Sequence, residues 1–165
     1  MHKSGFINII GKPNVGKSTL INKLVGEQLS IITSKVQTTR HRILGIVNGD
    51  NFQLVISDTP GIIKPKYSLQ KSMMDFVKEA IDDADIILYV IEMGEKINIE
   101  KKLHQKFIDS TIPVIILINK IDLSTQNDVD LTIHTIQEMY QKSEVFAISA
   151  LNNLILILFL KDLLI

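Results

Sequence analysis

The chain has 165 residues, a length typical of one domain with a sizeable hydrophobic core. Lysine and arginine together number 18, as do aspartate and glutamate, and this zero net charge excludes a global field that would draw the chain to nucleic acid or anionic lipid. The chain has no cysteine, which excludes disulfides and thiolate metal sites, and residues 1–5 are too polar to begin a signal peptide, so we expect a cytoplasmic protein.

Short apolar runs alternate with longer amphipathic stretches along the chain. The runs are rich in β-branched residues and leucine and are bounded by polar residues, glycine or proline, a pattern typical of strands covered on both faces. The predicted strands are residues 6–10, 43–48, 52–57, 85–91, 114–118 and 145–149. The predicted helices are residues 17–25, 69–82, 99–110 and 130–142.

The order of these elements predicts the fold class. Gly49, Asp50 and Asn51 stand between two of the strands and indicate a hairpin, which adds one antiparallel edge strand. Elsewhere strands and helices alternate, as in a doubly wound, mainly parallel sheet with helices on both faces. We therefore expect one α/β domain over residues 1–165.

The stretch between the first strand and the first helix has the pattern of a phosphate loop. Residues 11–18 read GKPNVGKS and satisfy G-x-x-x-x-G-K-[ST] in the strand–loop–helix context that this motif requires. Lys17 would reach the β- and γ-phosphates, and the Ser18 hydroxyl would bind Mg²⁺; the alternative is a tight strand-to-helix turn. The predicted contacts to the nucleotide here are Asn14, Val15, Gly16, Lys17, Ser18 and Thr19.

A second motif concerns the base. Residues 119–122 read NKID and follow the predicted strand 114–118, at the carboxyl end where open α/β sheets bind ligands. The Asp122 carboxylate can accept both hydrogens of guanine's N1–H and 2-amino edge, a donor pair that adenine lacks. Lys120 can cover the base, and Asn119 can tie this loop to the phosphate loop. Alone this is an ordinary polar loop, but after a phosphate loop it predicts guanine.

Two further strand ends complete the pattern. Residues 58–61 read DTPG, in which Asp58 can hold Mg²⁺ through water and Gly61 can offer its N–H to a γ-phosphate on a segment able to move. The alternative for this stretch is a β-turn. After the last strand, we expect the backbone N–H groups around Ser149, Ala150 and Leu151 to lie near the guanine oxygen.

In this order and spacing, the motifs resemble the translation-factor-like branch of P-loop GTPases. Residues 37–42, QTTRHR, followed by ILGI, are similar to the Era family of bacterial ribosome-assembly GTPases, and the likeness extends over residues 5–150. The resemblance implies a P-loop NTPase fold of the Era G-domain type. It also implies that the chain binds GTP or GDP with Mg²⁺.

By the same resemblance, Thr38 and Thr39 belong to the first switch, and one of them, with Thr39 preferred, binds Mg²⁺ when GTP is present. Many GTPases place a water-orienting glutamine where this chain has Ile62, which has neither donor nor acceptor, so slow hydrolysis is implied. The implied metal ligands are Ser18, Thr39 and Asp58. The implied catalytic residues are Lys17, Thr39 and Gly61.

Asn14 leaves two alternatives open. In related GTPases with asparagine at this place, its side-chain carbonyl binds K⁺ near the β–γ bridge, where an arginine finger would otherwise act. The other alternative is that Asn14 only suits the turn geometry of the loop.

The resemblance implies 16S rRNA and the 30S subunit as partners, and no DNA. Era proteins continue into a KH-type RNA-binding domain, of which we find no G-x-x-G loop here, and the basic clusters 35–42 and 64–71 lie in presumed switches. We therefore expect weak or no RNA binding by this chain alone. Peripheral association with the inner membrane is an alternative to a purely cytoplasmic location.

Residues 154–160 are apolar on every face, whereas the closing helix of such a domain should be amphipathic. Two alternatives stand: an unusually apolar closing helix, or a degraded or truncated end with a patch prone to self-association.

Three functions are compatible with these residues. The favoured one is a slowly hydrolysing GTP switch in small-subunit maturation. The second is a nucleotide-binding fragment with negligible turnover and no RNA partner. The third is a P-loop ATPase or small-molecule kinase, against which Asp122 argues.

Overall fold

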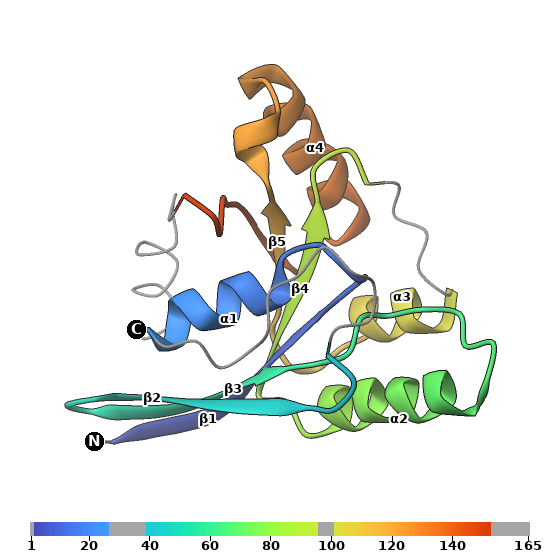
Figure 1. The fold of residues 1–165 in the computed structure, drawn as a ribbon. Coiled ribbons are helices and arrows are strands. Elements are labelled where there is room, and N and C mark those ends of the chain that lie inside the picture. Colours follow the sequence, from blue (N-terminus) through green and yellow to red (C-terminus); the bar gives the residue numbers. More distant parts are fainter. Residues whose placement is uncertain (1, 27–38, 96–100, 153–165) are drawn as a thin grey trace.

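The computed structural model describes residues 2–26, 39–95 and 101–152, and within these ranges six strands form one mixed sheet (Figure 1). The strands are β1 (Lys3–Gly11), β2 (Ile43–Gly49), β3 (Phe52–Asp58), β4 (Ile86–Glu92), β5 (Val114–Asn119) and β6 (Glu144–Ala147). The helices are α1 (Lys17–Val25), α2 (Ser68–Asp82), α3 (Lys101–Ile108) and α4 (Gln126–Met139), with a short 3₁₀ turn, η1 (Ile121–Leu123).

The strand order is β2-β3-β1-β4-β5-β6, and only the β2–β3 pair among the described strands is antiparallel. Asp50 and Asn51 join the two strands of that pair, with Gly49 opposite Phe52. Since β2 stands first in the strand order, it is an edge strand. This arrangement confirms the predicted α/β class, the hairpin and the single antiparallel edge strand.

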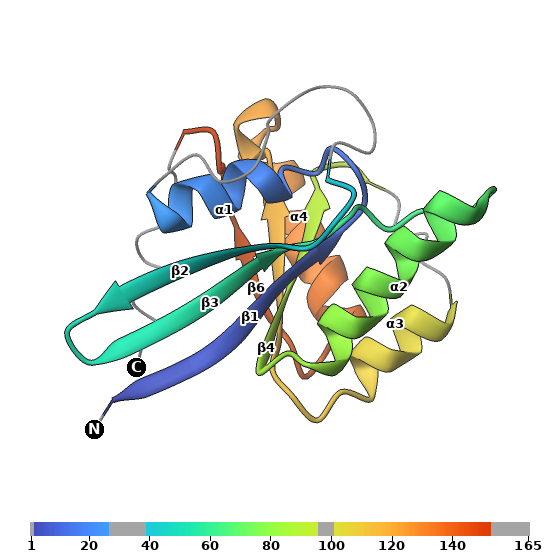
Figure 2. The same ribbon diagram turned by 60° about the horizontal axis from the view of Figure 1, so that its bottom comes forward.

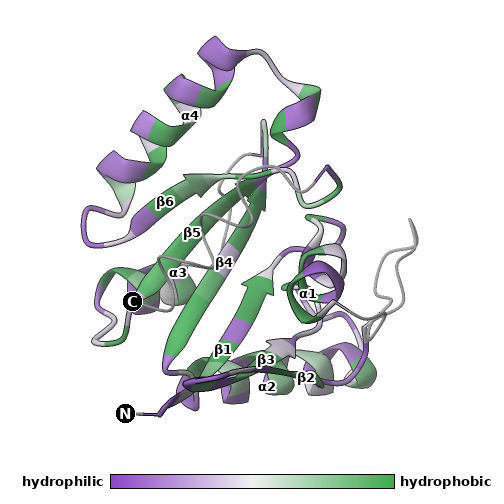
Figure 3. Cartoon of the chain, turned by 90° about the vertical axis from the view of Figure 1, so that its left-hand side faces the viewer, coloured by the Kyte–Doolittle hydropathy of each residue, from purple (hydrophilic) through white to green (hydrophobic). Residues whose placement is uncertain are grey.

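Helices cover both faces of the sheet, as Figure 2 shows for α1 on one side and α2 and α3 on the other. Leu20, Ile21 and Leu24 of α1 pack on one face, whereas α2, α3 and α4 pack on the other. All six residues of β5 are buried, and the central strands are coloured as hydrophobic along most of their length in Figure 3. Burial on both faces is the reason why these strands are continuous apolar runs.

The fourth helix differs from its prediction. It begins at Gln126 rather than at residue 130, because the Thr125 side chain accepts a hydrogen bond from the Asp128 amide at 3.3 Å and caps the helix. It ends at Met139 rather than at residue 142, since the backbone of Tyr140 leaves the helical region and its ring is buried. The residues at 154–160 lie outside the described part of the chain.

The carboxyl ends of three parallel strands bring the sequence motifs to one edge of the sheet. The strand β1 ends at Gly11, β3 ends at Asp58 and β5 ends at Asn119, and each end leads into one of the motifs. Because these strands are parallel, their carboxyl ends lie at the same edge of the sheet, which is where open α/β folds bind their ligands.

Candidate nucleotide-binding site

The phosphate loop has the backbone conformation that its sequence demands. Asn14 and Gly16 both adopt left-handed conformations, with φ of 65° and 100°, and Gly16 directly precedes α1. A Cβ atom on Gly16 would lie 2.2 Å from the Asn119 side-chain nitrogen, so only glycine satisfies both the conformation and the close approach. The loop therefore leads into the amino end of α1, where backbone N–H groups and the helix dipole favour anions.

Lys17 is held inside this loop. Its Nζ donates to the carbonyl oxygens of Gly11 at 3.0 Å and of Lys12 at 2.7 Å, and the side chain is buried. Burial lowers the pKa of the ammonium to about 8, while the Asp58 and Glu95 carboxylates act in the opposite direction. A phosphate in the loop would give this buried cation the negative partner that favours its charged form.

Three oxygen-bearing side chains from separate segments meet beside Lys17. Asp58 Oδ2 accepts a hydrogen bond from Ser18 Oγ at 2.8 Å and from Thr39 Oγ1 at 3.3 Å, and the two hydroxyl oxygens are 3.4 Å apart. The other carboxylate oxygen, Asp58 Oδ1, is buried and has no hydrogen-bond partner among the described residues. Hard oxygen ligands of this kind suit Mg²⁺, and the unsatisfied oxygen fits a metal or its water.

Thr38, the other candidate ligand of the first switch, lies outside the described residues. Among the residues that the structure describes, there is no group of three or more His, Cys, Asp and Glu side chains suited to a metal. The oxygens of Ser18, Thr39 and Asp58 are too few to enclose a metal by themselves; in phosphate-loop sites, oxygens of the nucleotide supply the remaining ligands.

The segment after β3 lies directly against the phosphate loop. A Cβ on Gly61 would come within 2.6 Å of the Pro13 nitrogen, and the Ile62 amide donates to the Gly11 carbonyl at 3.0 Å. The half-buried Ile62 side chain packs against the core on the α2 and α3 side. Gly61 is thus adjacent to the loop, whereas Ile62 contributes to the core.

Asn119 links three loops. Its Nδ2 donates to the Val15 carbonyl at 2.8 Å, and its Oδ1 accepts from the Ala150 amide at 2.9 Å. The predicted tie to the phosphate loop is thus present in the structure. The Ala150 amide, which we expect near guanine, donates to Asn119 in this structure. Ser149 is fully buried, and Leu151 is exposed next to it.

Asp122 is exposed on η1, and the residue before that turn, Lys120, has a left-handed backbone with φ of 67°. The Lys120 ammonium pairs with Glu92 Oε2 at 2.8 Å. The remaining predicted contact of the helix start, Thr19, is half-buried in the first turn of α1.

Sequence reasoning missed two acidic residues: Glu92, which ends β4, and Glu95, which lies in the segment after it. Glu92 pairs with Lys120, and Glu95 pairs with Lys12 of the phosphate loop at 2.6 Å. The loop after β4 therefore holds both the phosphate loop and the base loop. The signal was available: Glu92 ends a buried strand at the same edge of the sheet as Asp58 and Asn119.

Within residues 2–26, 39–95 and 101–152, no helix combines the length and apolar character that crossing a bilayer requires.

Comparison with known proteins agrees with this geometry. The family model described as 50S ribosome-binding GTPase matches residues 6–120. GTPase Era of Clostridium beijerinckii is 41% identical over 154 residues, which cover 93% of this chain and 52% of that protein. The chain thus spans about half the length of the curated relatives it matches.

Solved structures give the same result. A crystal structure of Era in complex with MgGDPNP and a segment of 16S ribosomal RNA superposes with a TM-score of 0.91 at 40% identity, covering 99% of this chain and 57% of that one. NFeoB from S. thermophilus, bound to GDP.AlF4⁻ and K⁺, superposes with a TM-score of 0.69 at 28% identity and covers 98% and 60% of the two chains. With the family model spanning most of its length, the chain belongs to the 50S ribosome-binding GTPase family.

Proposed function

We propose that this chain is a molecular switch that binds guanine nucleotides with Mg²⁺ and hydrolyses GTP slowly. The observation that carries the proposal is the meeting of Ser18, Thr39 and Asp58 beside the buried Lys17, where one oxygen of Asp58 has no partner in the part of the chain that the structure describes. A carboxylate oxygen buried in this way is costly unless a ligand satisfies it. Era, a relative at 40% identity, has been crystallised with MgGDPNP, which supports the same ligands here.

Each of these side chains has a distinct task in the proposed reaction. Ser18, Thr39 and Asp58 would hold Mg²⁺, which neutralises charge on the β- and γ-phosphates. Lys17 would stabilise charge on the bridging and γ-oxygens, and the Gly61 amide would donate to the γ-phosphate. The phosphate contacts otherwise come from the backbone of residues 14–19.

Slow turnover follows from the position of Ile62. Its side chain packs against the core and has no polar atom with which to orient a water molecule. The attacking water must therefore be positioned by the backbone, the phosphates or a bound cation. For the cation we propose K⁺ at Asn14, as K⁺ is bound in the related NFeoB structure.

Guanine selectivity is proposed to come from Asp122. The Lys120–Glu92 ion pair and the Asn119 bridge hold the loop on which this carboxylate lies. Adenine lacks the N1–H and 2-amino donor pair of guanine, so an adenine nucleotide would leave the Asp122 carboxylate unpaired. This loss should weaken adenine binding relative to guanine binding by about 1–3 kcal/mol.

The biological role is proposed from similarity to Era. The Era complex with 16S rRNA suggests small-subunit maturation as the process and the 30S subunit as the partner. The G domain described here has balanced charge, so we expect its own affinity for RNA to be low. We propose the cytoplasm as the compartment, with peripheral membrane association as the alternative.

The Ile62 packing also favours a second candidate, a nucleotide-binding protein with negligible turnover. Single-turnover hydrolysis of radiolabelled GTP separates the two: a measurable rate above the spontaneous one supports the switch, and a rate equal to it supports the binding protein. Competition between GTP and ATP, with ATP displacing GTP at equal concentration, would instead indicate a P-loop ATPase.

The metal site is tested with Ser18→Ala. This variant should lose GTP affinity in Mg²⁺ but little of it in EDTA, because the hydroxyl acts through the metal. Ser72→Ala, which removes an exposed hydroxyl from α2, is the matched control and should bind as the parent does. Equal affinity of parent and Ser18→Ala in Mg²⁺ would contradict the site.

A further inference from the structure

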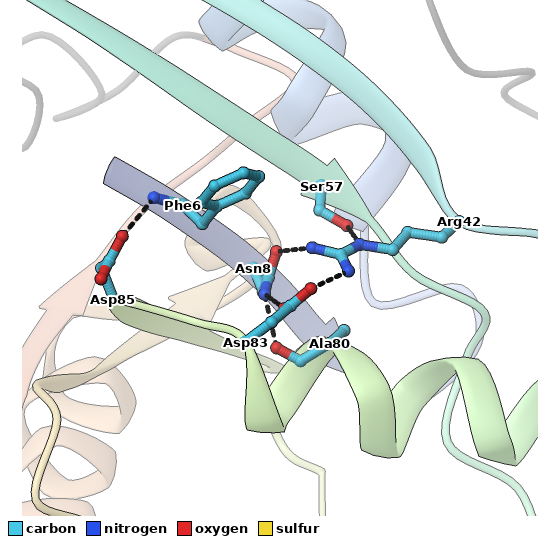
Figure 4. A network of polar contacts seen from close by, with 7 residues as sticks. All are labelled: Phe6, Asn8, Arg42, Ser57, Ala80, Asp83 and Asp85. Carbon is cyan, nitrogen blue, oxygen red and sulfur yellow. Dashed lines mark hydrogen bonds and ion pairs between the residues drawn. The ribbon is translucent and has the colours of Figure 1, made fainter. Parts of the chain in front are cut away.

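A partly buried polar cluster joins the end of the first switch stretch to two strands and to the end of α2 (Figure 4). The Arg42 guanidinium lies at its centre, directly before β2. Its Nε donates to Ser57 Oγ at 2.7 Å, and Nη2 donates to Asn8 Oδ1 at 2.9 Å. Its Nη1 forms an ion pair with Asp83, the residue that caps the end of α2.

Asn8 completes the cluster from the central strand β1. Its side chain is fully buried, and its Nδ2 donates to the Ala80 carbonyl and to Asp83 Oδ1, the latter at 2.8 Å. Because the amide nitrogen faces α2, the amide oxygen is left to face Arg42. Asn8 and Ser57 are also partners in the β1–β3 register, so the guanidinium spans two adjacent strands.

Only arginine can make this set of contacts. The three bonds leave one planar group in three directions, toward β3, β1 and α2, which matches the fixed fork of a guanidinium. A lysine ammonium is a compact point charge and cannot reach all three acceptors. The cluster therefore requires arginine at position 42.

The cluster lies close in sequence to two residues of the candidate metal site, Thr39 and Asp58. Arg42 is three residues after Thr39, a span of at most about 10 Å even when extended. Ser57 directly precedes Asp58. His41 makes a second contact with α2, because its ring packs edge-on against the ring of Phe76 at a centroid distance of 5.6 Å.

We propose that Arg42 is a positioning residue, which anchors the end of the first switch so that the Thr39 hydroxyl stays beside Asp58. Through Asp83 it also connects this switch to the far end of α2, the helix that follows the Gly61 segment. Arg42 thus joins the end of the first switch to β1, β3 and the end of α2 in one partly buried anchor. The role assigned to Thr39 rests on the proposed function; the anchoring itself does not.

The experiment compares nucleotide affinities. Arg42→Ala and Arg42→Lys should each weaken binding of a non-hydrolysable GTP analogue in Mg²⁺ by about 10-fold, while GDP affinity changes less than about twofold. GDP should be less sensitive because, by the proposed function, Thr39 binds Mg²⁺ only when GTP is present. Lys78→Ala, which breaks the exposed Lys78–Asp75 ion pair on α2, is the control and should change neither affinity.

Asp83→Asn keeps the test decisive if the Arg42 variants fold poorly, because the Asp83 side chain is half exposed. It should lower the ratio of GTP-analogue to GDP affinity in the same direction, whereas Asp75→Asn on the same helix should not. A purely structural role predicts that both affinities fall together. Equal losses for the two nucleotides, or no loss for either, would overturn the proposal.

Hydrogen–deuterium exchange in the nucleotide-free chain tests the anchor independently of any nucleotide. Arg42→Ala should speed exchange in residues 39–45 and in residues 80–86 together, and Lys78→Ala in neither. Faster exchange at only one of the two segments, or at neither, would overturn the coupling. If the parent chain bound no guanine nucleotide, the proposed function would fail while this measurement still decided the anchoring.

Discussion

The side-chain amide of Asn119 donates to the backbone carbonyl of Val15 at 2.8 Å, so the loop after β5 holds the loop after β1 across 104 residues of sequence. Both residues are buried. The amide oxygen accepts from Ala150, so one side chain fixes three loops at the carboxyl edge of the sheet. The loops that we propose to recognise the base and the phosphates are therefore held to each other by one buried side chain.

Replacing Asn119 should cost stability before any ligand is added. Asn119→Ala leaves the Val15 carbonyl and the Ala150 amide without their partner, which should lower the free energy of unfolding by about 1–3 kcal/mol. Asn119→Asp keeps an acceptor for Ala150 but cannot donate to Val15, so it should also destabilise. Urea denaturation of the nucleotide-free chain measures both.

Gln126→Ala provides the comparison for these variants. It removes an exposed amide that donates to Asp130 on α4, and it should shift the free energy of unfolding by less than about 0.5 kcal/mol. If Asn119→Ala were no more destabilising than Gln126→Ala, the amide would not be holding the loops together.

The sequence predicted those parts of the fold and site that depend on local patterns. The helix α1 has the bounds expected for it, because the phosphate-loop motif fixes where β1 ends and where the helix begins. The mainly parallel sheet follows from the βα alternation, and its antiparallel edge strand follows from the hairpin at Gly49. The start of α4 was also predictable, since Thr125 and Asp128 have the spacing of a helix cap, a signal that a search for apolar periodicity overlooks.

Contacts between distant residues could not be predicted in this way. Arg42 and Asp83 are 41 residues apart, and neither lies in a pattern that names the other as its partner. The pairing of Glu92 with Lys120 likewise depends on β4 and β5 being neighbours, which the sequence implies, and on side-chain directions, which it does not. Such partners follow from the packing of elements rather than from spacing along the chain.

The depressed pKa of Lys17 predicts a pH dependence of binding. In the free chain its pKa is about 8, below its ordinary value of 10.5, because burial disfavours the charged form. Phosphate oxygens favour the ammonium, so the pKa is higher in the complex, and above pH 8 binding takes up a proton. Nucleotide affinity should therefore fall as pH rises from about 8, by at most about tenfold per pH unit.

Calorimetric titrations with GDP between pH 7 and pH 9 measure this fall. Lys17→Ala should bind more weakly at every pH and lose this component of the slope. Lys23→Ala, which removes an exposed lysine on the same helix, should keep the parent's slope. A slope that persists unchanged in Lys17→Ala would place the titrating group elsewhere.

Base selectivity should change with Asp122. Asp122→Asn replaces a double acceptor with one donor and one acceptor, which suits the N1–H and 2-oxo edge of xanthine better than the two donors of guanine. Direct competition should show the variant losing GTP preference and gaining affinity for xanthosine triphosphate. Asp130→Asn on α4 controls for loss of charge, and unchanged GTP preference in Asp122→Asn would contradict the guanine assignment.

The chain has Ile62, not glutamine, directly after the DTPG motif of residues 58–61. Since the Ile62 side chain packs against the core and cannot orient a water molecule, other groups must lower the barrier. We propose that a monovalent cation bound by Asn14 stabilises charge at the β–γ bridge. Asn14 is exposed at the tip of that loop. Hydrolysis should therefore be faster in K⁺ than in Na⁺ at equal ionic strength.

Substitutions of Asn14 can distinguish a role of its side chain in binding a cation from a role in the backbone conformation of the loop. Asn14 has φ of 65°, a conformation that alanine adopts only with strain, so Asn14→Gly is the cleaner way to remove the side-chain carbonyl. Both Asn14→Gly and Asn14→Ala should abolish the difference between K⁺ and Na⁺, whereas Asn14→Asp, which keeps an oxygen ligand, should retain part of it. If asparagine served only the turn, the parent chain would hydrolyse GTP at the same rate in both salts, and glycine would replace it without loss.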